Sequence, residues 1–571
     1  MTKTPLQPPV APRRHSTRVH HGDEVVDEYE WMRDKTDEHL LAHLAAENTY
    51  TDAMTAHLAD VRDDIFGEIK SHVQQSDLSV PVRHGDWWYY TRTMEGAQYP
   101  VYARVAVTSS PQRPEVESGS VPDGEQVMLD ANAEAADEEF FSLGALDVSV
   151  SGALLAYAVD TTGDERFDLR VKDLATGDVL DSQVDAIGYG VAWSADDEYL
   201  FYTRVDQAWR PYQIWRHRLG EPVGSDVLVH QEDDERYWMG LGTSRDDRYV
   251  MIGLGSKNTS EWWLLPAAQP LEDFTVVATR SEGVEYDVEP AGDGLWIVHN
   301  RNHTDFELAW APADTATPDE WLTVLPGAEG VRISSVDAFA THLAISVRKA
   351  GLTEVEILPL DSSGQPRRDD MQTVPVDEAI YTVEVGSNPD YQSSTVQVQV
   401  ESMLTPASVF DLDVQSGTMT LLKRKQVPGG YDPSNYVQQR LWATASDGTS
   451  IAISLVYHRH VEADGTAAGV LYGYGAYEIC VDPHFSPSRL SYLDRGVVYA
   501  IAHVRGGGEL GRSWYEGGRM EHKLNTFTDF VASADYLTES GWVAPGRLAA
   551  VGGSAGGLLI GAVINLAPSR F

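Results

Sequence analysis

A series of short β-rich segments constrains the fold of this chain more than any other feature. The segments lie between about residues 80 and 425 and read WWYYTRT, LLAYAVD, YLFYTRV, YVMIGLG, LWIVHN, LAISVRK and STVQVQV. A tight-turn signal precedes each one, near Gly85, Ser151, Asp196, Asp246, Gly292, Thr341 and Pro389. After the first, the signals recur about every 45 to 50 residues, which is typical of propeller blades. They predict a seven-bladed β-propeller over residues 75–425, whereas an array of β-sandwiches would leave the even spacing unexplained.

The segment before the propeller has a helical pattern. Between residues 31 and 73, apolar side chains recur every three or four positions and so share one face of a helix; they are Met54, Leu58, Val61, Ile65 and Ile69. The stripe indicates packing rather than chemistry. We expect residues 1–74 to form a helical extension that packs on the hydrolase domain described next.

The pattern changes again after the propeller. The stretch KRKQVPGGYDPSNY is rich in proline and glycine, as linkers are. A hairpin-like pair follows in LWATASDGTSIAISLVYH, then continuous apolar strands in GVLYGYGAY and GVVYAIAHVRGGGELG, then a helical run in NTFTDFVASADYLTES. Strands that alternate with helices predict an α/β sheet. We therefore expect residues 427–571 to form a partial α/β domain.

The stretch LAAVGGSAGGLLIGAVINL near the end of the chain fits a nucleophile elbow. Gly552, Ser554 and Gly556 match G-x-S-x-G, between an apolar strand and an apolar helix. In such an elbow the serine occupies a strained turn, so the residues two positions away must lack bulk. The alternative is a helix start with small residues that merely packs against a sheet.

Other motifs in the sequence do not indicate a nucleotide or metal site. Gly506, Gly508 and Gly511 match G-x-G-x-x-G, but the polar, glycine-containing stretch RSWYEGGRMEHK follows instead of an apolar helix. A nucleotide site is therefore disfavoured. No HExxH, CxxC or P-loop pattern occurs, so the sequence predicts neither a metal site nor a cofactor.

Composition narrows the class of protein. Hydrophobic residues make up 42% of the 571, which suits a folded chain of more than one domain. The net charge of −44 argues against nucleic acid as a partner and is compatible with cationic ligands or with simple solvation. The N-terminus lacks the apolar stretch of a secretory signal, and no run is long enough to span a membrane. These features predict a cytoplasmic protein without a membrane partner.

Several blocks together resemble the prolyl oligopeptidase family of serine peptidases. They are YEWMRD, YGYGAY, HVRGGGELGRSWYEGG, NTFTDF and GGSAGG. Within the family the likeness is strongest to oligopeptidase B, through LWATASDGTSIAISLVYH and FSPSRLSYLDRGVVYAIAHVRGGGELG. The resemblance implies a seven-bladed propeller that covers an α/β-hydrolase domain. It also implies a serine oligopeptidase that cleaves short peptides after Arg or Lys.

The resemblance assigns roles to individual residues. Ser554 matches the nucleophile, and the N–H of Ala555 with the hydroxyl of Tyr474 matches the two donors of the oxyanion hole. Asp482, and with it Tyr477, would contact the substrate. His484 stands where the resemblance implies a second acidic residue, so the sequence departs from the family pattern at this position. Tyr474 could alternatively be a core aromatic, and the single cysteine, Cys480, is either a modifiable thiol or a buried inert one.

The base that serine catalysis requires is missing from these residues. In α/β-hydrolases the acid and the histidine follow the serine in the chain. The 17 residues after Ser554 contain no Asp, Glu or His, and His484, His503 and His522 precede it. We therefore expect a hydrolase domain truncated at its C-terminus, without the triad Asp and His, and a chain that is inactive by itself. The alternatives are a non-catalytic propeller that binds peptides or proteins, and a relative of acylaminoacyl-peptidases or esterases.

Overall fold

The computed structural model describes residues 6–107, 113–114, 119–315 and 317–571, which fall into two compact units, 1–73 and 74–571. The first unit contains the hairpin β1 (Ser16–His20) and β2 (Asp23–Asp27), followed by the helices α1 (Glu38–Thr55) and α2 (Ala59–Ser71). The carboxylate of Asp37 caps α1 by accepting hydrogen bonds from the N–H groups of His39 and Leu40. A short 3₁₀ turn, Ala56–Leu58, separates the two helices, so the predicted apolar stripe is divided between them. No helix of the described residues is long and apolar enough to cross a membrane.

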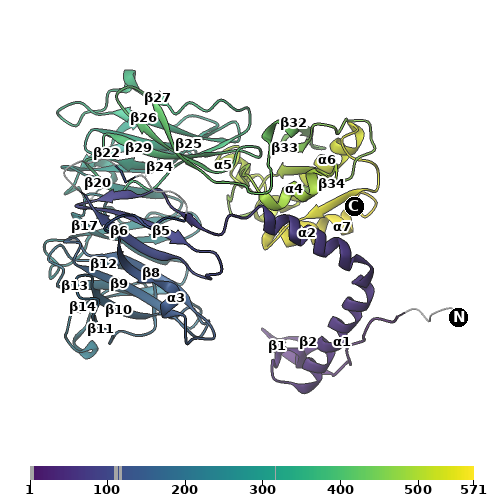
Figure 1. Ribbon diagram of the computed structural model, residues 1–571, viewed down its shortest axis with the longest axis horizontal. Helices are drawn as coiled ribbons and strands as arrows, with labels where there is room; N and C mark the ends of the chain where they lie inside the picture. Colours follow the sequence, from purple (N-terminus) through teal and green to yellow (C-terminus); the bar gives the residue numbers. More distant parts are fainter. Residues whose placement is uncertain (1–5, 108–112, 115–118, 316) are drawn as a thin grey trace. The chain divides into compact units, whose positions relative to one another are not determined.

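The second unit begins with seven antiparallel sheets, one per blade, as the spacing of the turn signals predicts (Figure 1). Blade 1 contains β3 (Asp77–Leu78), β4 (Val82–His84), β5 (Trp87–Thr93), β6 (Val101–Ala106) and β7 (Gln126–Asp130), followed by the short helix α3 (Ala131–Glu134). Blade 2 contains β8 (Ser142–Val148), β9 (Leu154–Asp160), β10 (Asp168–Asp173) and β11 (Val179–Asp181). Blade 3 contains β12 (Ile187–Trp193), β13 (Tyr199–Val205), β14 (Pro211–Arg218) and β15 (Val227–Gln231).

The remaining four blades follow in the same order along the chain. Blade 4 contains β16 (Trp238–Thr243), β17 (Tyr249–Gly255), β18 (Ser260–Pro266) and β19 (Thr275–Val276). Blade 5 contains β20 (Tyr286–Ala291), β21 (Gly294–His299), β22 (Glu307–Pro312) and β23 (Leu322–Leu325). Blade 6 contains β24 (Val331–Ala338), β25 (His342–Lys349), β26 (Leu352–Pro359) and β27 (Gln372–Thr373). Blade 7 contains β28 (Thr382–Val385), β29 (Thr395–Glu401), β30 (Ser408–Asp413) and β31 (Met419–Arg424).

The turn signals have one structural role in every blade. Each lies directly before the apolar strand that occupies the middle of a blade, for example between β12 and β13. In the turns of blades 1, 3 and 4, Gly85, Asp197 and Asp247 adopt positive φ angles between 56° and 59°. Glycine and aspartate tolerate this conformation better than other residues, which explains why these turns could be recognised in the sequence.

The chain then forms a five-stranded mixed sheet with the order β32-β33-β35-β34-β36. Its strands are β32 (Tyr436–Thr444), β33 (Ser450–His458), β34 (Gly469–Tyr472), β35 (Val498–His503) and β36 (Leu548–Val551). Its helices are α4 (Pro487–Leu493), α5 (Arg512–Glu516), α6 (Lys523–Glu539) and α7 (Ala555–Leu566). β32, β33 and β35 pair antiparallel, whereas β34 is parallel to both of its neighbours.

Both faces of this sheet are buried, which is why its central strands read as continuous apolar runs. Leu455 belongs to the core that α6 and α7 cover, whereas its neighbour Val456 packs with Leu490 and Leu493 of α4. Successive side chains of a strand point to opposite faces, so α4 lies on the other side of the sheet from α6 and α7. Met403, in the propeller, is buried in the same cluster as α4 and so joins the two domains.

A buried charge cluster stabilises blades 2 and 3. His217 on β14 is 2.7 Å from a carboxylate oxygen of Asp226 through Nδ1, and 3.0 Å from Asp181 through Nε2. The hydroxyl of Tyr202 donates to the other oxygen of Asp226. Burial alone would lower the pKa of His217, but the hydrogen bonds to Asp181 and Asp226 raise it above its ordinary value. The imidazolium therefore holds two buried carboxylates together.

We expect the free energy of unfolding to depend on pH through this histidine. The folded-state pKa is raised, so its contribution is complete below the unfolded pKa of about 6.5 and is lost as pH rises through the folded pKa. His217→Gln should destabilise the protein by about 3 kcal/mol or more at pH 6, because it leaves two buried carboxylates without a cation. The difference from the parent protein should shrink at pH 9. Urea denaturation at both pH values tests this, with the exposed His460→Gln as control; equal destabilisation at both pH values would contradict it.

Candidate active site

Parallel pairing brings the two predicted catalytic segments to the same edge of the sheet. Tyr472, the last residue of β34, pairs with Val551, the last residue of β36. The N–H of Gly473 continues the ladder by donating to the carbonyl of Val551 at 3.2 Å. Carboxyl ends of parallel strands are where α/β sheets place their sites. The turn that carries Ser554 therefore lies beside the loop that carries Tyr474.

Ser554 has the backbone conformation of a strained elbow. Its φ is 53° and its ψ is −121°, and it immediately precedes the first residue of α7. A Cβ at Gly552 would lie 2.5 Å from the carbonyl oxygen of Gly556, and a Cβ at Gly556 would lie 2.7 Å from that of Gly473. The two glycines therefore allow a close approach of backbones that any side chain would prevent, as an elbow requires.

The two predicted oxyanion donors belong to segments that lie next to Ser554. Ala555 is the first residue of α7, and the N–H groups of a first helical turn have no partner within the helix. The ring of Tyr474 lies beside Gly556, since its Cδ2 would be 3.6 Å from a Cβ at that position. Within the described part of the chain, the Tyr474 hydroxyl has no hydrogen-bond partner. Both groups are thus available to a ligand next to Ser554.

Of the upstream histidines, His503 is engaged away from the elbow. His503 is completely buried, and its Nε2 is 2.8 Å from both the Ser454 hydroxyl and the Arg440 guanidinium. Its Nδ1 is 3.7 Å from Glu509, so Ser454, His503 and Glu509 are arranged like a triad. All three side chains are buried, so no substrate reaches this Ser454 hydroxyl. A serine, a histidine and a carboxylate arranged in this way cannot catalyse hydrolysis when substrate cannot reach the serine.

Asp482 is paired with the propeller. Its two oxygens accept hydrogen bonds of 2.7 and 2.8 Å from the two Nη atoms of Arg348, on β25. Burial alone would raise the pKa of Asp482, but the Arg348 guanidinium lowers it below its ordinary value. Nearby, His484 Nδ1 lies 2.7 Å from Glu401 at the end of β29, and this hydrogen bond raises the pKa of His484. The region predicted to contact a substrate thus also joins the two domains.

Tyr477 and Cys480, the other two candidate residues of this loop, differ in their surroundings. Tyr477 has a φ of 61°, is 55% exposed, and lies under the ammonium group of Lys257, 4.4 Å from its ring centroid. Cys480 is half-buried, and burial raises the pKa of its thiol to about 12. A thiol with so high a pKa is protonated near neutral pH and is a poor nucleophile. This favours the inert reading of Cys480.

The glycine-rich stretch serves packing. A Cβ at Gly506 would overlap the carbonyl oxygen of Gly475, and a Cβ at Gly508 would lie 2.6 Å from that of Glu478. The helix that follows, α5, has only five residues. The glycines therefore let this stretch lie directly against the Tyr474 loop, which accounts for their spacing without a nucleotide. No group of three or more His, Cys, Asp or Glu residues in the described ranges is arranged to hold a metal ion.

Sequence reasoning missed the propeller side of the site. Arg348 precedes Asp482 by 134 positions, and Glu401 precedes His484 by 83. No local pattern marks either residue, because each is an ordinary position of a blade. Only the docking of the domains gives these residues their partners.

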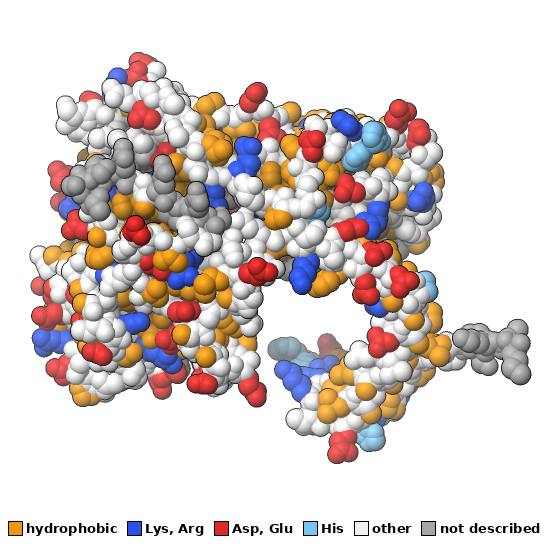
Figure 2. Space-filling view, in the orientation of Figure 1, with side chains coloured by type: hydrophobic (Ala, Val, Ile, Leu, Met, Phe, Trp, Pro, Cys, Tyr) orange, Lys and Arg blue, Asp and Glu red, His pale blue; other side chains and the backbone are white. Residues whose placement is uncertain are grey.

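The net charge is spread over the surface. Acidic side chains are scattered among basic ones over the propeller face in Figure 2, which indicates that most of the negative charge serves solvation.

Known proteins share this architecture over nearly the whole chain. Residues 8–425 match the N-terminal β-propeller domain of prolyl oligopeptidase, and residues 483–571 match the prolyl oligopeptidase family. Dipeptidyl aminopeptidase BI of Pseudoxanthomonas mexicana is 38% identical over 573 residues, 99% of this chain and 78% of that protein. Protease 2 of Moraxella lacunata is 35% identical over 565 residues, 99% of this chain and 79% of that protein.

A solved structure extends the similarity to three dimensions. Oligopeptidase B from Trypanosoma brucei, in a closed form with covalently bound antipain, superposes with a TM-score of 0.91. The two sequences are 33% identical, and the match covers 99% of this chain and 81% of that one. The propeller and the hydrolase sheet thus both have counterparts in this structure.

Proposed function

Because this chain belongs to the prolyl oligopeptidase family, we propose that it hydrolyses short peptides after arginine or lysine through an acyl-enzyme on Ser554. The observation that carries the proposal is the elbow of Ser554 with the Tyr474 loop beside it. A serine at such a turn presents its hydroxyl at the edge of the sheet, where a peptide can approach. The covalently bound antipain of the Trypanosoma brucei structure supports a covalent mechanism in the family.

Each residue has a defined step in this mechanism. The Ser554 Oγ attacks the carbonyl carbon of the peptide bond while its proton passes to a general base. The negative charge that forms on the carbonyl oxygen is stabilised by the N–H of Ala555 and the hydroxyl of Tyr474. The C–N bond then breaks, the base returns the proton to the leaving amine, and water hydrolyses the acyl ester to regenerate the serine.

The general base and its carboxylate are proposed to come from polypeptide beyond Phe571. No Asp, Glu or His follows Ser554 up to that residue. The surface next to the elbow supports the idea, since β36 is the last strand of the sheet and Leu558 and Leu566 of α7 are more than half exposed. An unpaired sheet edge and an exposed apolar helix face of this kind are normally covered. Residues 1–571 alone are therefore proposed to have no measurable peptidase activity.

Preference for a basic side chain is supported by the carboxylate of Asp482 in the loop that follows Tyr474. In the structure, however, Arg348 already occupies both carboxylate oxygens of Asp482. A substrate guanidinium can take this position only when Arg348 withdraws. We propose that the two guanidinium groups compete for Asp482.

A panel of fluorogenic peptides tests the proposal. It is assayed with residues 1–571 and with the same residues extended by the C-terminal remainder of a relative's hydrolase domain. We expect the extended protein to cleave N-terminally blocked substrates after Arg and Lys at least tenfold faster than after Pro, and the shorter one to cleave none. Faster cleavage after Pro would contradict the basic preference.

The same panel separates the other candidate functions. The name of the Pseudoxanthomonas mexicana relative suggests removal of dipeptides, which requires a free N-terminus. Activity only on unblocked substrates would support that function instead. Cleavage of N-acetylated amino acids or simple esters alone would support an acylaminoacyl-peptidase or esterase. Peptide binding without any turnover in the extended protein would support a non-catalytic propeller module.

A further inference from the structure

The loop that follows Tyr474 is strained at two adjacent residues. Tyr477 and Glu478 both have φ angles of 61°, a region that residues other than glycine rarely adopt. Such a conformation is strained and persists only where the surroundings hold it. The contacts of this loop therefore indicate what keeps Tyr474 in place.

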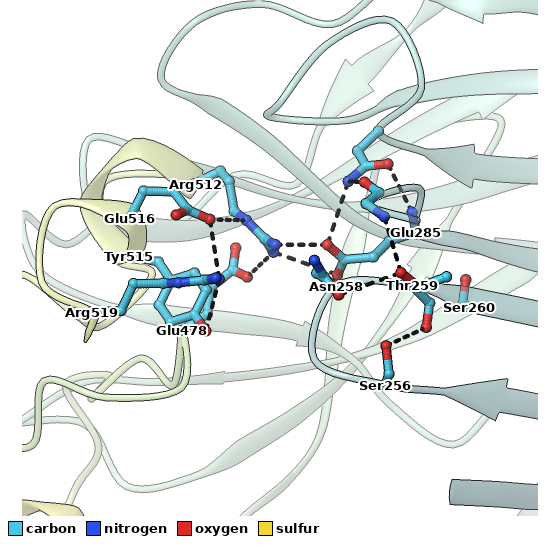
Figure 3. Close-up of polar contacts among 12 residues, drawn as sticks. Ser256, Asn258, Thr259, Ser260, Glu285, Glu478, Arg512, Tyr515, Glu516 and Arg519 are labelled. Carbon is cyan, nitrogen blue, oxygen red and sulfur yellow. Dashed lines mark hydrogen bonds and ion pairs between the residues drawn. The ribbon is translucent and has the colours of Figure 1, made fainter. Parts of the chain in front are cut away.

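The Glu478 carboxylate is held by two arginines from different domains. One oxygen is 2.5 Å from Nη1 of Arg512 on α5, and the other is 3.4 Å from Nε of Arg332 on the propeller strand β24. Arg332 is itself fixed, because its guanidinium stacks 3.4 Å from the ring centroid of Phe306. Arg512 reaches in the other direction to Glu285 of the propeller, at 2.7 Å through Nη2. Figure 3 shows Arg512 between Glu478 and Glu285.

A second contact fixes the backbone beneath this cluster. The N–H of Arg512 donates to Asp305 of the propeller at 2.7 Å, and the other oxygen of Asp305 accepts from the N–H of Gly330. Gly511 has a φ of 92°, and a Cβ there would lie 2.7 Å from the Asp305 carboxylate. The start of α5 is thus docked on blades 5 and 6 through both backbone and side chain.

The glycine-rich stretch transmits this docking to the Tyr474 loop. The N–H of Glu478 donates to the carbonyl of Gly506 at 3.2 Å, and Gly506 and Gly508 lie too close to this loop for side chains. The glycine-rich stretch therefore lies between the propeller and the Tyr474 loop. The Glu478 side chain also connects the Tyr474 loop directly to the propeller, through Arg332.

We propose that Glu478 is a positioning residue, through which the docked propeller holds the Tyr474 hydroxyl in the oxyanion hole. The strained loop is set in its functional conformation only while Arg332 and Arg512 both hold the Glu478 carboxylate. The expected effect of Glu478 on kcat rests on the proposed function. Its expected effect on the order of the Tyr474 loop does not.

Hydrogen exchange of the 571-residue chain tests the structural consequence. Glu478→Gln keeps the size of the side chain and removes its charge, and Glu478→Gly removes the carboxylate and relieves the backbone strain. We expect both variants to raise the exchange rates of amides in residues 474–480 at least tenfold. The control Glu198→Gln removes an exposed carboxylate that pairs with Arg218 within the propeller, and should leave these rates unchanged. Unchanged exchange in both Glu478 variants would overturn the proposal.

Kinetics of the extended, active protein test the positioning role. We expect Glu478→Gln to lower kcat at least tenfold and to change KM less than twofold. In a Tyr474→Phe background the same change should cost less than twofold, because the donor that it positions is gone. An equal loss in both backgrounds would overturn the proposal. If the extended protein has no peptidase activity, the proposed function fails and the exchange measurement alone decides the role of Glu478.

Discussion

Ser554→Ala is expected to abolish peptide cleavage by the extended protein, lowering kcat by roughly 10⁶ as the loss of a triad serine does in other hydrolases. Alanine keeps the Cβ, so the elbow with its φ of 53° faces the same steric restrictions and the fold should be retained. Only the attacking oxygen is removed. Hydrolysis of a fluorogenic arginine substrate and labelling by a fluorophosphonate probe both measure the effect.

Ser540→Ala provides the matched control. This serine is the C-cap of α6, is exposed, and donates its hydroxyl to the carbonyl of Tyr536 at 2.6 Å. Its replacement should leave both labelling and turnover unchanged. Substantial labelling of the Ser554→Ala protein would mean that another nucleophile does the chemistry. Efficient labelling of residues 1–571 alone would mean that a base reaches Ser554 from within these residues.

The second large effect is expected at Tyr474. Tyr474→Phe should lower kcat by about 10²–10³, the usual loss when one oxyanion donor is removed. KM should change little, because the hydroxyl contributes most when charge develops on the carbonyl oxygen in the transition state. The ring that packs beside Gly556 is retained, so the effect should not come from misfolding. Initial rates over a range of substrate concentrations separate the two parameters.

The neighbouring tyrosine of the same motif serves as the control. Tyr472 packs against the cluster of Met403 and Leu490, on the face of the sheet that α4 covers. Tyr472→Phe should therefore leave kcat within about twofold of the parent. Equal losses in the two variants would show that Tyr474 is a core aromatic and not an oxyanion donor.

The sequence by itself determined the elements that depend on local physics. Turn residues such as Gly85 and Asp196 marked the blades, because only a few residue types adopt tight turns at low cost. The two buried faces of β33 and β35 produced continuous apolar runs. Gly552 and Gly556 marked the elbow of Ser554, because the close approach of backbones there excludes any larger residue. Each of these patterns lies in the same short stretch of sequence as the turn or strand that it predicts.

Only the tertiary structure decided the partners of the charged residues. Asp482, interpreted from its position as a substrate contact, is paired with Arg348, and Glu478 is held by Arg332 and Arg512. These ion pairs form where docking brings the blades and the loop together, at separations from 34 residues for Glu478–Arg512 to 146 for Arg332–Glu478, and no local pattern records that geometry. The glycines of residues 506–511 match a local motif, but the structure shows why they are needed. They allow the backbone of the Tyr474 loop to pack directly against them.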